Sequence, residues 1–341
     1  MKIGVMLPYA GPASIWRTGS ETCAQLALAA NEGRAPRASL YFVDCGATPQ
    51  ATADAAQHLL EDSDVDIVVG MQLSHQREVA ADVFKGNLPY IYTPQYEGAD
   101  CGPGVIPIGL EDDEVLGPGI EKIGLMFGVE RWSFVGNDYL WPLKGVNVAH
   151  RHVSRCGGQL VHTHFRPFDD ENFEPLIAEI LTSDAQAVIV GLLGEESVRF
   201  HRAFAAYGLA DRIPRFSLAL DETLLWALEV EQTANLFACQ TYYLNHHSNA
   251  RADVVARHRK LFGDTAPPLT SMSLGVYDGV SLALRLGQVA QSPSRKSLSD
   301  FVSQGLDRSK ALSLLGLADP KTSRQRPRVA AAHAFAFHEM L

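Results

Sequence analysis

The chain has 341 residues, of which 46% are hydrophobic and 20% charged, and its formal net charge is −10. This length suits two ordinary domains, and the composition is that of a globular chain rather than a disordered one. The acidic balance excludes binding to nucleic acid by charge alone, because that needs a basic face. A late basic stretch, which includes Lys321, Arg324 and Arg328, is broken by Ser and Pro and predicts a solvated loop.

The first third of the chain alternates strand-like and helix-like segments, which is the pattern of a parallel sheet covered by helices. The predicted strands are residues 3–7, 39–44, 66–70 and 89–92, and the predicted helices are 20–31, 50–61 and 76–85. A loop from Thr93 to Gly104 follows the fourth strand. These elements together predict one α/β unit.

The same order begins again after residue 111 and predicts a second α/β unit. Its predicted strands are 132–136, 159–164, 187–190, 215–218 and 237–243. Its first predicted helix ends at about 127, and the others span 142–156, 171–182, 195–207 and 222–229. Helices at 251–262, 273–288 and 297–304 follow, and one strand-like segment at 328–337 ends the chain.

The repeated order predicts two Rossmann-like lobes with parallel sheets. A chain that continues after two complete lobes must cross between them again, so we expect a multi-strand hinge. The predicted N-terminal lobe comprises residues 1–108 and about 244–305. The predicted C-terminal lobe comprises about 109–243 and about 306–341.

The cysteines and the start of the chain bear on its compartment. Cysteines at 23, 45, 101, 156 and 239 form no CxxC pair, which predicts buried free thiols. No apolar run approaches the roughly 18 residues of a membrane span. The apolar stretch before Pro8 is too short for a signal peptide. We therefore expect a cytoplasmic protein if Met1 is the native start, and a periplasmic one if a signal peptide was removed.

The sequence carries no catalytic signature. It has no GxGxxG after the first strand, no GxxxxGK[ST], no GxSxG and no HExxH, so we expect neither an enzyme nor a bound cofactor. His162 and His164 would share one face of a strand, and further histidine pairs occur at 150 and 152 and at 246 and 247. Without a convergent carboxylate, none of these pairs predicts a metal site.

Ligands of open parallel α/β sheets bind at the carboxyl ends of the strands. Among the loops that this rule selects are residues 70–75, 92–98, 137–141 and 219–222. In the first, Ser74 is predicted as a helix N-cap, where its hydroxyl and free backbone N–H groups can meet a ligand oxygen. The second offers aromatic faces and hydroxyls on a Pro-stiffened loop, and the third holds Tyr139. This mixture suits a small polar ligand.

Three segments, GMQLSHQREV from Gly70, YTPQYEG from Tyr92 and VGNDYLWP from Val135, carry a resemblance to a known family. They resemble the amide- and urea-binding branch of the type I periplasmic-binding-protein-like solute-binding proteins. That branch includes urea and short-chain-amide receptors of ABC transporters and the cytosolic amide-sensing regulator of an amidase operon. The resemblance implies the type I periplasmic binding protein fold and a pocket lined by Ser74, the loop 92–96 and Tyr139.

Matched position by position, Ser74 and Tyr139 carry over, and so does Tyr92. There are three departures. Gln72 stands where the amide regulator has a tyrosine, Pro94 where it has a threonine, and Leu220 where a hydroxyl residue is expected. A more apolar second-lobe wall would suit a larger or less polar ligand. The candidate ligand-binding residues are Gln72, Ser74, Tyr92, Thr93, Pro94, Tyr96, Asp138, Tyr139 and Leu220.

The implied function is capture of an amide- or urea-like solute between two lobes by hinge closure, without catalysis. The alternative is a branched-chain or polar amino-acid receptor, in which Asp138, Asp221 or Glu97 would pair with the ligand ammonium. The partner would be an ABC permease, or, for an amidase-operon-type negative regulator, an RNA-binding antiterminator protein. A homodimer is compatible with both, and no direct contact with nucleic acid is expected.

Overall fold

The computed structural model describes residues 1–33, 37–98, 100–245, 251–290, 292–317 and 326–340. The chain divides into two compact units, Met1–Gly109 with Ser248–Arg326 and Leu110–His247 with Pro327–Leu341. It therefore passes from one unit to the other three times. The histidine pair at 246 and 247 and the basic residues Lys321 and Arg324 lie outside the described residues.

In the first unit, the described strands form a parallel sheet in the order β2-β1-β3-β4-β5. Their bounds are β1 Lys2–Leu7, β2 Ser39–Asp44, β3 Ile67–Gly70, β4 Tyr90–Tyr92 and β5 Val105–Pro107. All residues of β3 and β4 are buried, as expected of strands covered on both faces. Strand β5 falls directly after the predicted loop and is too short to show a periodic pattern.

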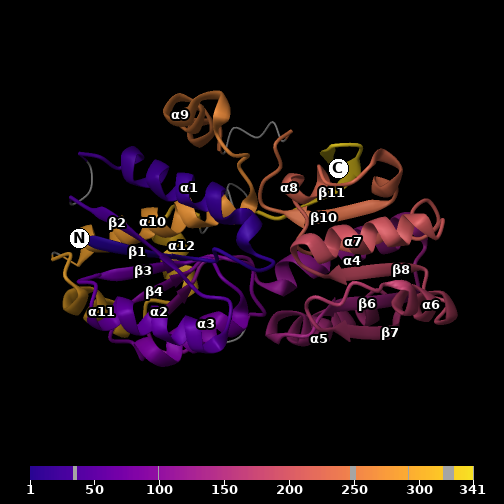
Figure 1. The fold of residues 1–341 in the computed structure, drawn as a ribbon, viewed down its shortest axis with the longest axis horizontal. Helices are drawn as coiled ribbons and strands as arrows, with labels where there is room; N and C mark the ends of the chain where they lie inside the picture. The colour runs from indigo at the N-terminus through magenta and orange to yellow at the C-terminus, as the bar shows by residue number, and fades with distance from the viewer. Residues whose placement is uncertain (34–36, 99, 246–250, 291, 318–325, 341) are drawn as a thin grey trace. The chain divides into compact units, whose positions relative to one another are not determined.

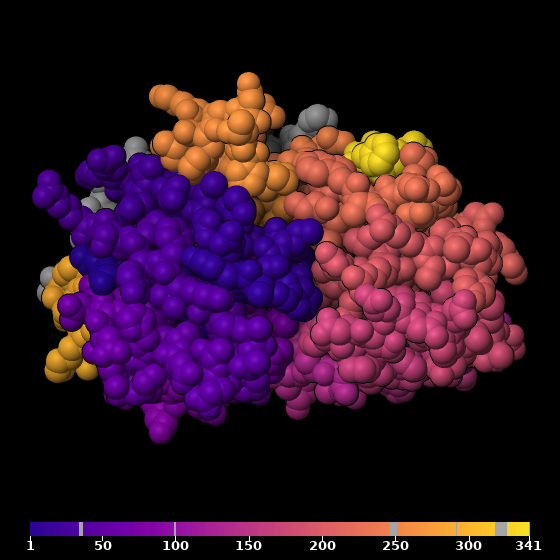
Figure 2. Space-filling model, viewed as in Figure 1, coloured from indigo at the N-terminus to yellow at the C-terminus, as the bar shows by residue number. Residues whose placement is uncertain are grey.

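Helices cover both faces of this sheet (Figure 1). The pair α1 and α10 pack together on one face, and α2 and α3 pack together on the other. The bounds are α1 Arg17–Ala30, α2 Pro49–Glu61, α3 Ser74–Phe84, α9 Ala252–Phe262, α10 Ser271–Val289, α11 Arg295–Ser303 and α12 Arg308–Leu314, with 3-10 turns at Ser14–Trp16 and Gly263–Thr265. Helix α9 packs on α1 and protrudes from the surface of this unit (Figure 2).

Residues 306–326 belong to the first unit, whereas the sequence predicted the crossing into the second lobe at about residue 306. The reason is α12, a short helix that the sequence pattern did not reveal. It packs against α10 and β5, and Arg308 at its start donates to the Gly109 carbonyl oxygen at 3.1 Å. The chain enters the second unit only at Pro327.

The second unit contains a mixed sheet, whose described strands lie in the order β12-β11-β10-β9-β8-β6-β7. The bounds are β6 Arg131–Asn137, β7 Gln159–Arg166, β8 Ala187–Gly191, β9 Arg215–Ser217, β10 Leu236–Gln240, β11 Arg328–His333 and β12 Ala336–Glu339. Strands β6 to β10 are parallel, and β11 and β12 are antiparallel. The predicted single strand at 328–337 is therefore wrong: the left-handed Ala334 (φ 54°) turns the chain into a hairpin.

The helices of this unit are α4 Asp112–Phe127, α5 Leu140–Arg155, α6 Glu174–Thr182, α7 Gly194–Ala206 and the single turn α8 Glu222–Leu225, with a 3-10 turn at Val230–Thr233. Helices α4 and α5 pack together, and α6 and α7 share one core cluster with β6 and β8. The expected fold class, two α/β units built on parallel sheets, is thus confirmed, with an antiparallel hairpin added to the second sheet.

No helix among the described residues has the length and apolar character needed to cross a membrane. All five cysteines are free thiols. Four are buried as expected, but Cys156 is exposed at the end of α5.

Candidate ligand-binding site

In the first unit, Ser74 lies where β3 ends and α3 begins. It is the first residue of the helix, and Leu73 holds the N-cap position that the sequence predicted for Ser74. The side chain of Gln76 takes over the capping role, because its Oε1 accepts from the Leu73 backbone N–H at 3.0 Å. The Ser74 hydroxyl instead donates to Glu97 Oε2 at 2.9 Å, so a second loop fixes its position.

Glu97 also forms an ion pair that sequence reasoning missed. Arg77 Nη2 donates to Glu97 Oε1 at 2.5 Å, and both side chains are at most 2% exposed. Burial alone would raise the pKa of Glu97, but the hydrogen bond and charge of Arg77 outweigh it, so the pKa lies below its ordinary value. Both carboxylate oxygens of Glu97 are engaged within this unit. Glu97 is therefore a poor candidate for a ligand ammonium partner.

Tyr92 links the two neighbouring strand ends. Its hydroxyl donates to the Gln72 carbonyl oxygen at 2.8 Å, and the Arg77 guanidinium lies 5.1 Å from its ring centroid. The Thr93 backbone N–H and hydroxyl both donate to the Gly70 carbonyl oxygen, at 3.0 and 3.1 Å. Gln72 Oε1 is buried and has no hydrogen-bond partner among the described residues.

The rest of the loop after β4 packs inward. Tyr96 is 3% exposed and belongs, with Tyr92, to the hydrophobic core cluster of this unit. The Pro94 carbonyl oxygen approaches Gly109 so closely that a Cβ at that position would lie 1.8 Å from it. The structure thus brings Gln72, Ser74 and Tyr92 together with Arg77 and Glu97, whereas Pro94 and Tyr96 shape the loop behind them.

In the second unit, Tyr139 lies at the corresponding strand end, after β6 and before α5. Its ring centroid is 5.4 Å from that of Phe168 and 6.3 Å from that of Trp141. The Trp141 indole donates to Asp112 Oδ1 at 2.7 Å, which anchors α5 to the start of α4. We call Tyr139, Trp141 and Phe168 the Tyr139 aromatic group.

Buried polar side chains hold the loops around this group. Asn137 Oδ1 accepts from the Leu193 backbone N–H at 3.0 Å, and its Nδ2 donates to Glu196 at 2.5 Å, so the ends of β6 and β8 are tied together. Asp138 follows with an exposed side chain, while its backbone N–H donates to the Arg166 carbonyl oxygen at 2.7 Å.

The loop after β9 contains the departure Leu220, which is fully buried. Asp221 caps α8 by accepting from the Thr223 backbone N–H at 3.0 Å. Glu222 is 2% exposed, and its Oε1 accepts from the Leu244 backbone N–H at 2.7 Å. Burial raises the pKa of Glu222 to about 7.

Sequence reasoning missed Arg77 and Phe168 as parts of these strand ends, and it missed the burial of Glu222. Arg77 lies one helical turn after Ser74, so the helical period would have placed the two on one face. Phe168 was missed because the predicted strand ended at residue 164, two residues before β7 ends at Arg166. Glu222 stood at the edge of a selected loop, but nothing in the sequence indicated its burial.

A family model described as periplasmic binding protein matches residues 1–333. The Leu/Ile/Val-binding protein homolog 6 of Brucella melitensis is 24% identical over 298 residues, which are 84% of this chain and 75% of that protein.

Among solved structures, an ABC-transporter solute-binding protein from Rhodopseudomonas palustris in complex with 3,4-dihydroxybenzoic acid has a TM-score of 0.82 at 18% identity, covering 100% of this chain and 96% of that one. A leucine-binding protein from Thermotoga maritima has a TM-score of 0.79 at 16% identity, covering 100% and 98%. At these identities the structures establish the fold, and the family match covers nearly the whole chain. The chain therefore belongs to the periplasmic binding protein family, whose members bind solutes and are not enzymes.

Proposed function

We propose that this protein captures a small solute by closing its two units around it, with Ser74 on one side and Tyr139 on the other. The observation that carries the proposal is that each unit places polar or aromatic side chains at the carboxyl ends of parallel strands. The start of α3 adds backbone N–H groups and a partial positive charge. Such a site suits a carbonyl or carboxylate oxygen of the ligand, and closure would follow from its contacts with both units.

The proposed ligand is an amide- or urea-like solute, as the resemblance of the three segments implies. The ion pair between Arg77 and Glu97 supports a neutral ligand, because the two charges neutralise each other beside Ser74. A neutral amide offers a carbonyl oxygen to the Ser74 end of α3 and a flat body to the Tyr139 aromatic group.

The second candidate is a branched-chain or polar amino acid. The relative in Brucella melitensis is named a Leu/Ile/Val-binding protein homolog. Asp138 supports this candidate, because its exposed carboxylate lies at the carboxyl end of β6, where it could receive a ligand ammonium. Asp221 already accepts from the backbone N–H and the hydroxyl of Thr223, which leaves Asp138 to separate the two candidates: an amide does not need its carboxylate, and an amino acid does.

A thermal-shift screen of the full chain tests the proposal, because a ligand that binds only the folded state raises the melting temperature. The panel holds short aliphatic amides, urea, branched-chain and polar amino acids, and hydroxybenzoates. For the ligand found, Ser74→Ala should weaken binding by about 5- to 30-fold, because Ser74 Oγ, which donates its proton to Glu97, can no longer accept from a ligand N–H. Ser303→Ala, which removes an exposed hydroxyl at the end of α11, is the matched control.

The outcomes separate the candidates. If the ligand is an amide or urea and Asp138→Asn still binds it, the amide candidate is supported. If the ligand is an amino acid and Asp138→Asn abolishes its binding, the amino-acid candidate is supported. Unchanged affinity in Ser74→Ala would show that the pocket lies elsewhere.

Delivery of the solute to an ABC permease is the proposed next step, and an RNA-binding antiterminator is the alternative partner. A permease gene beside the gene of this protein favours the permease as partner, and an amidase operon favours the antiterminator.

A further inference from the structure

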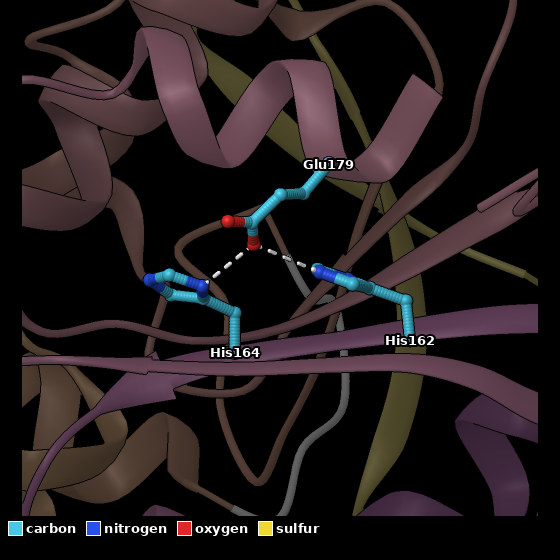
Figure 3. A group of neighbouring side chains, drawn as sticks. All are labelled: His162, His164 and Glu179. Carbon is cyan, nitrogen blue, oxygen red and sulfur yellow. Dashed lines mark hydrogen bonds and ion pairs between the residues drawn. The ribbon is translucent and has the colours of Figure 1, made fainter. Parts of the chain in front are cut away.

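Strand β7 and helix α6 bring two imidazoles and one carboxylate together. His162 and His164 project from one face of β7 with their rings stacked, 6.3 Å between centroids, and Glu179 reaches toward both from α6 (Figure 3). Glu179 Oε2 lies 2.8 Å from His164 Nδ1 and 3.3 Å from His162 Nε2. Glu179 is the convergent carboxylate whose absence from the sequence pattern argued against a metal site.

A fourth residue orients one of the imidazoles. Ser133 of β6 is fully buried, and its hydroxyl lies 2.7 Å from His162 Nδ1. The register between β6 and β7 shifts by one residue at Ser133, which pairs it with His162 rather than Val161. Bulges of this kind re-aim side chains at the edge of a sheet. Here the shift sets His162 beside an anchoring hydroxyl.

We propose that His162, His164 and Glu179 bind one divalent transition-metal ion, with Zn²⁺ as the cation that they suit. The three ligand atoms lie within 4.8 Å of one another. Imidazole nitrogen and carboxylate oxygen are ligands of Zn²⁺, whereas Mg²⁺ and Ca²⁺ prefer oxygen alone. The three ligands lie on β7 and α6, outside the loops proposed to bind the solute.

The distances fit an ion in place of the present hydrogen bonds. With bonds of about 2.1 Å, ligand atoms of a tetrahedral zinc site lie about 3.4 Å apart. The two separations from Glu179, 2.8 and 3.3 Å, need only small side-chain shifts to reach this spacing, and the two ring nitrogens lie at most 4.8 Å apart. Glu179 is 48% exposed and His164 31% exposed, so a water molecule can fill the fourth position. The ion would tie the edge strand β7 to α6.

Ser133 can serve both the empty and the loaded state. Without metal, a neutral His162 that donates from Nε2 to Glu179 has an unprotonated Nδ1, which accepts from the Ser133 hydroxyl. With metal on Nε2, the proton moves to Nδ1, which then donates to the Ser133 oxygen. A hydroxyl both donates and accepts, so this one partner fixes the ring in either tautomer.

Zinc titration of the full, tag-free chain against a chromophoric chelator tests the proposal. We expect one equivalent of Zn²⁺ to bind, and His162→Gln/His164→Gln to abolish that binding. Glu179→Gln should bind at least about 10-fold more weakly, and so should Ser133→Ala, which keeps all three ligands. Circular dichroism of each metal-free variant checks that it is folded. Cobalt binding provides a second readout, since its visible spectrum reports coordination geometry.

The matched control is His333→Gln/His338→Gln. These two histidines also lie close together, 5.9 Å between centroids, across the β11–β12 hairpin, but no metal cluster among the described residues includes them. This variant should bind zinc like the wild type. Absence of stoichiometric zinc binding in the wild type would overturn the proposal, and so would zinc binding that survives in His162→Gln/His164→Gln.

Discussion

Glu222 is a carboxylic acid that the second unit keeps out of water. It begins α8, is 2% exposed and uses one oxygen to accept from the Leu244 backbone N–H. Its other oxygen is buried without a hydrogen-bond partner among the described residues. Burial raises the pKa of this carboxyl to about 7 from a reference of 4.5, despite the hydrogen bond from Leu244. The folded state therefore favours the protonated acid.

This pKa predicts how stability depends on pH. The unfolded chain releases the Glu222 proton near pH 4.5, but the folded chain holds it to about pH 7. The contribution of Glu222 to the free energy of unfolding is therefore fully present below pH 4.5 and is lost as the pH rises through 7. Glu222→Gln removes the cost of ionisation and should raise the free energy of unfolding at pH 8 by about 3 kcal/mol relative to the wild type. Urea unfolding at pH 5 and pH 8 measures the difference. The exposed Glu231→Gln is the control, and equal pH slopes in Glu222→Gln and the wild type would contradict the prediction.

Single residues show what a sequence pattern can and cannot place. The strand-end rule selected Ser74 and Tyr139, and both lie at carboxyl ends of parallel strands. The period of two placed His162 and His164 on one face. The sequence pattern did not predict the hydrogen-bond partners of these residues: Glu97 lies 23 residues from Ser74, and Glu179 lies 15 residues from His164. Such contacts depend on how a loop or a helix packs, which local spacing does not encode.

At the scale of elements, the β11–β12 hairpin carries local strain. Ala334 between the two strands adopts φ 54°, a left-handed conformation that costs an L-residue roughly 1–2 kcal/mol and glycine almost nothing. Replacing Ala334 by glycine would relieve this strain, but the greater freedom of glycine in the unfolded chain offsets part of the gain in stability. Ala334→Gly should therefore stabilise the protein by about 0.5 kcal/mol, seen as a higher urea midpoint with an unchanged slope.

The matched control for the hairpin is Ala332→Gly. Ala332 pairs with Phe337 inside the ladder and has ordinary strand geometry, so glycine there should destabilise by roughly 0.5–1 kcal/mol. The same chemical change thus has opposite signs two residues apart. Destabilisation by Ala334→Gly would mean that the turn does not strain its alanine.

Elements of ordinary length were predictable, but not all of the short ones were. Strands β1, β2, β6 and β8 and helices α2, α4 and α7 lie within a few residues of their predicted bounds, because each shows enough periods of its apolar pattern. Strand β5 has three residues and helix α12 has seven, so neither shows a pattern distinct from a loop. The missing α12 displaced the predicted unit boundary, and the turn at Ala334 was hidden in an apparently continuous strand.

At the scale of the whole molecule, each unit has a hydrophobic core of its own. One core cluster draws all its members from the first unit, including Leu59, Phe84 and Tyr90. Another draws all its members from the second unit, including Ile177, Val188 and Phe200. Units with separate cores unfold as separate cooperative steps unless something couples them. A ligand bound to both units would supply such coupling.

Scanning calorimetry tests this coupling. Without ligand we expect two thermal transitions, and Glu222→Gln at pH 8 should identify the second unit's transition by raising it. A saturating ligand from the screen should raise both transitions, because its binding requires both units to be folded. Ser74→Ala should then reduce both shifts, although Ser74 belongs to the first unit alone, and Ser303→Ala should reduce neither. A ligand that raises only one transition would be held by one unit, and capture by closure would be wrong.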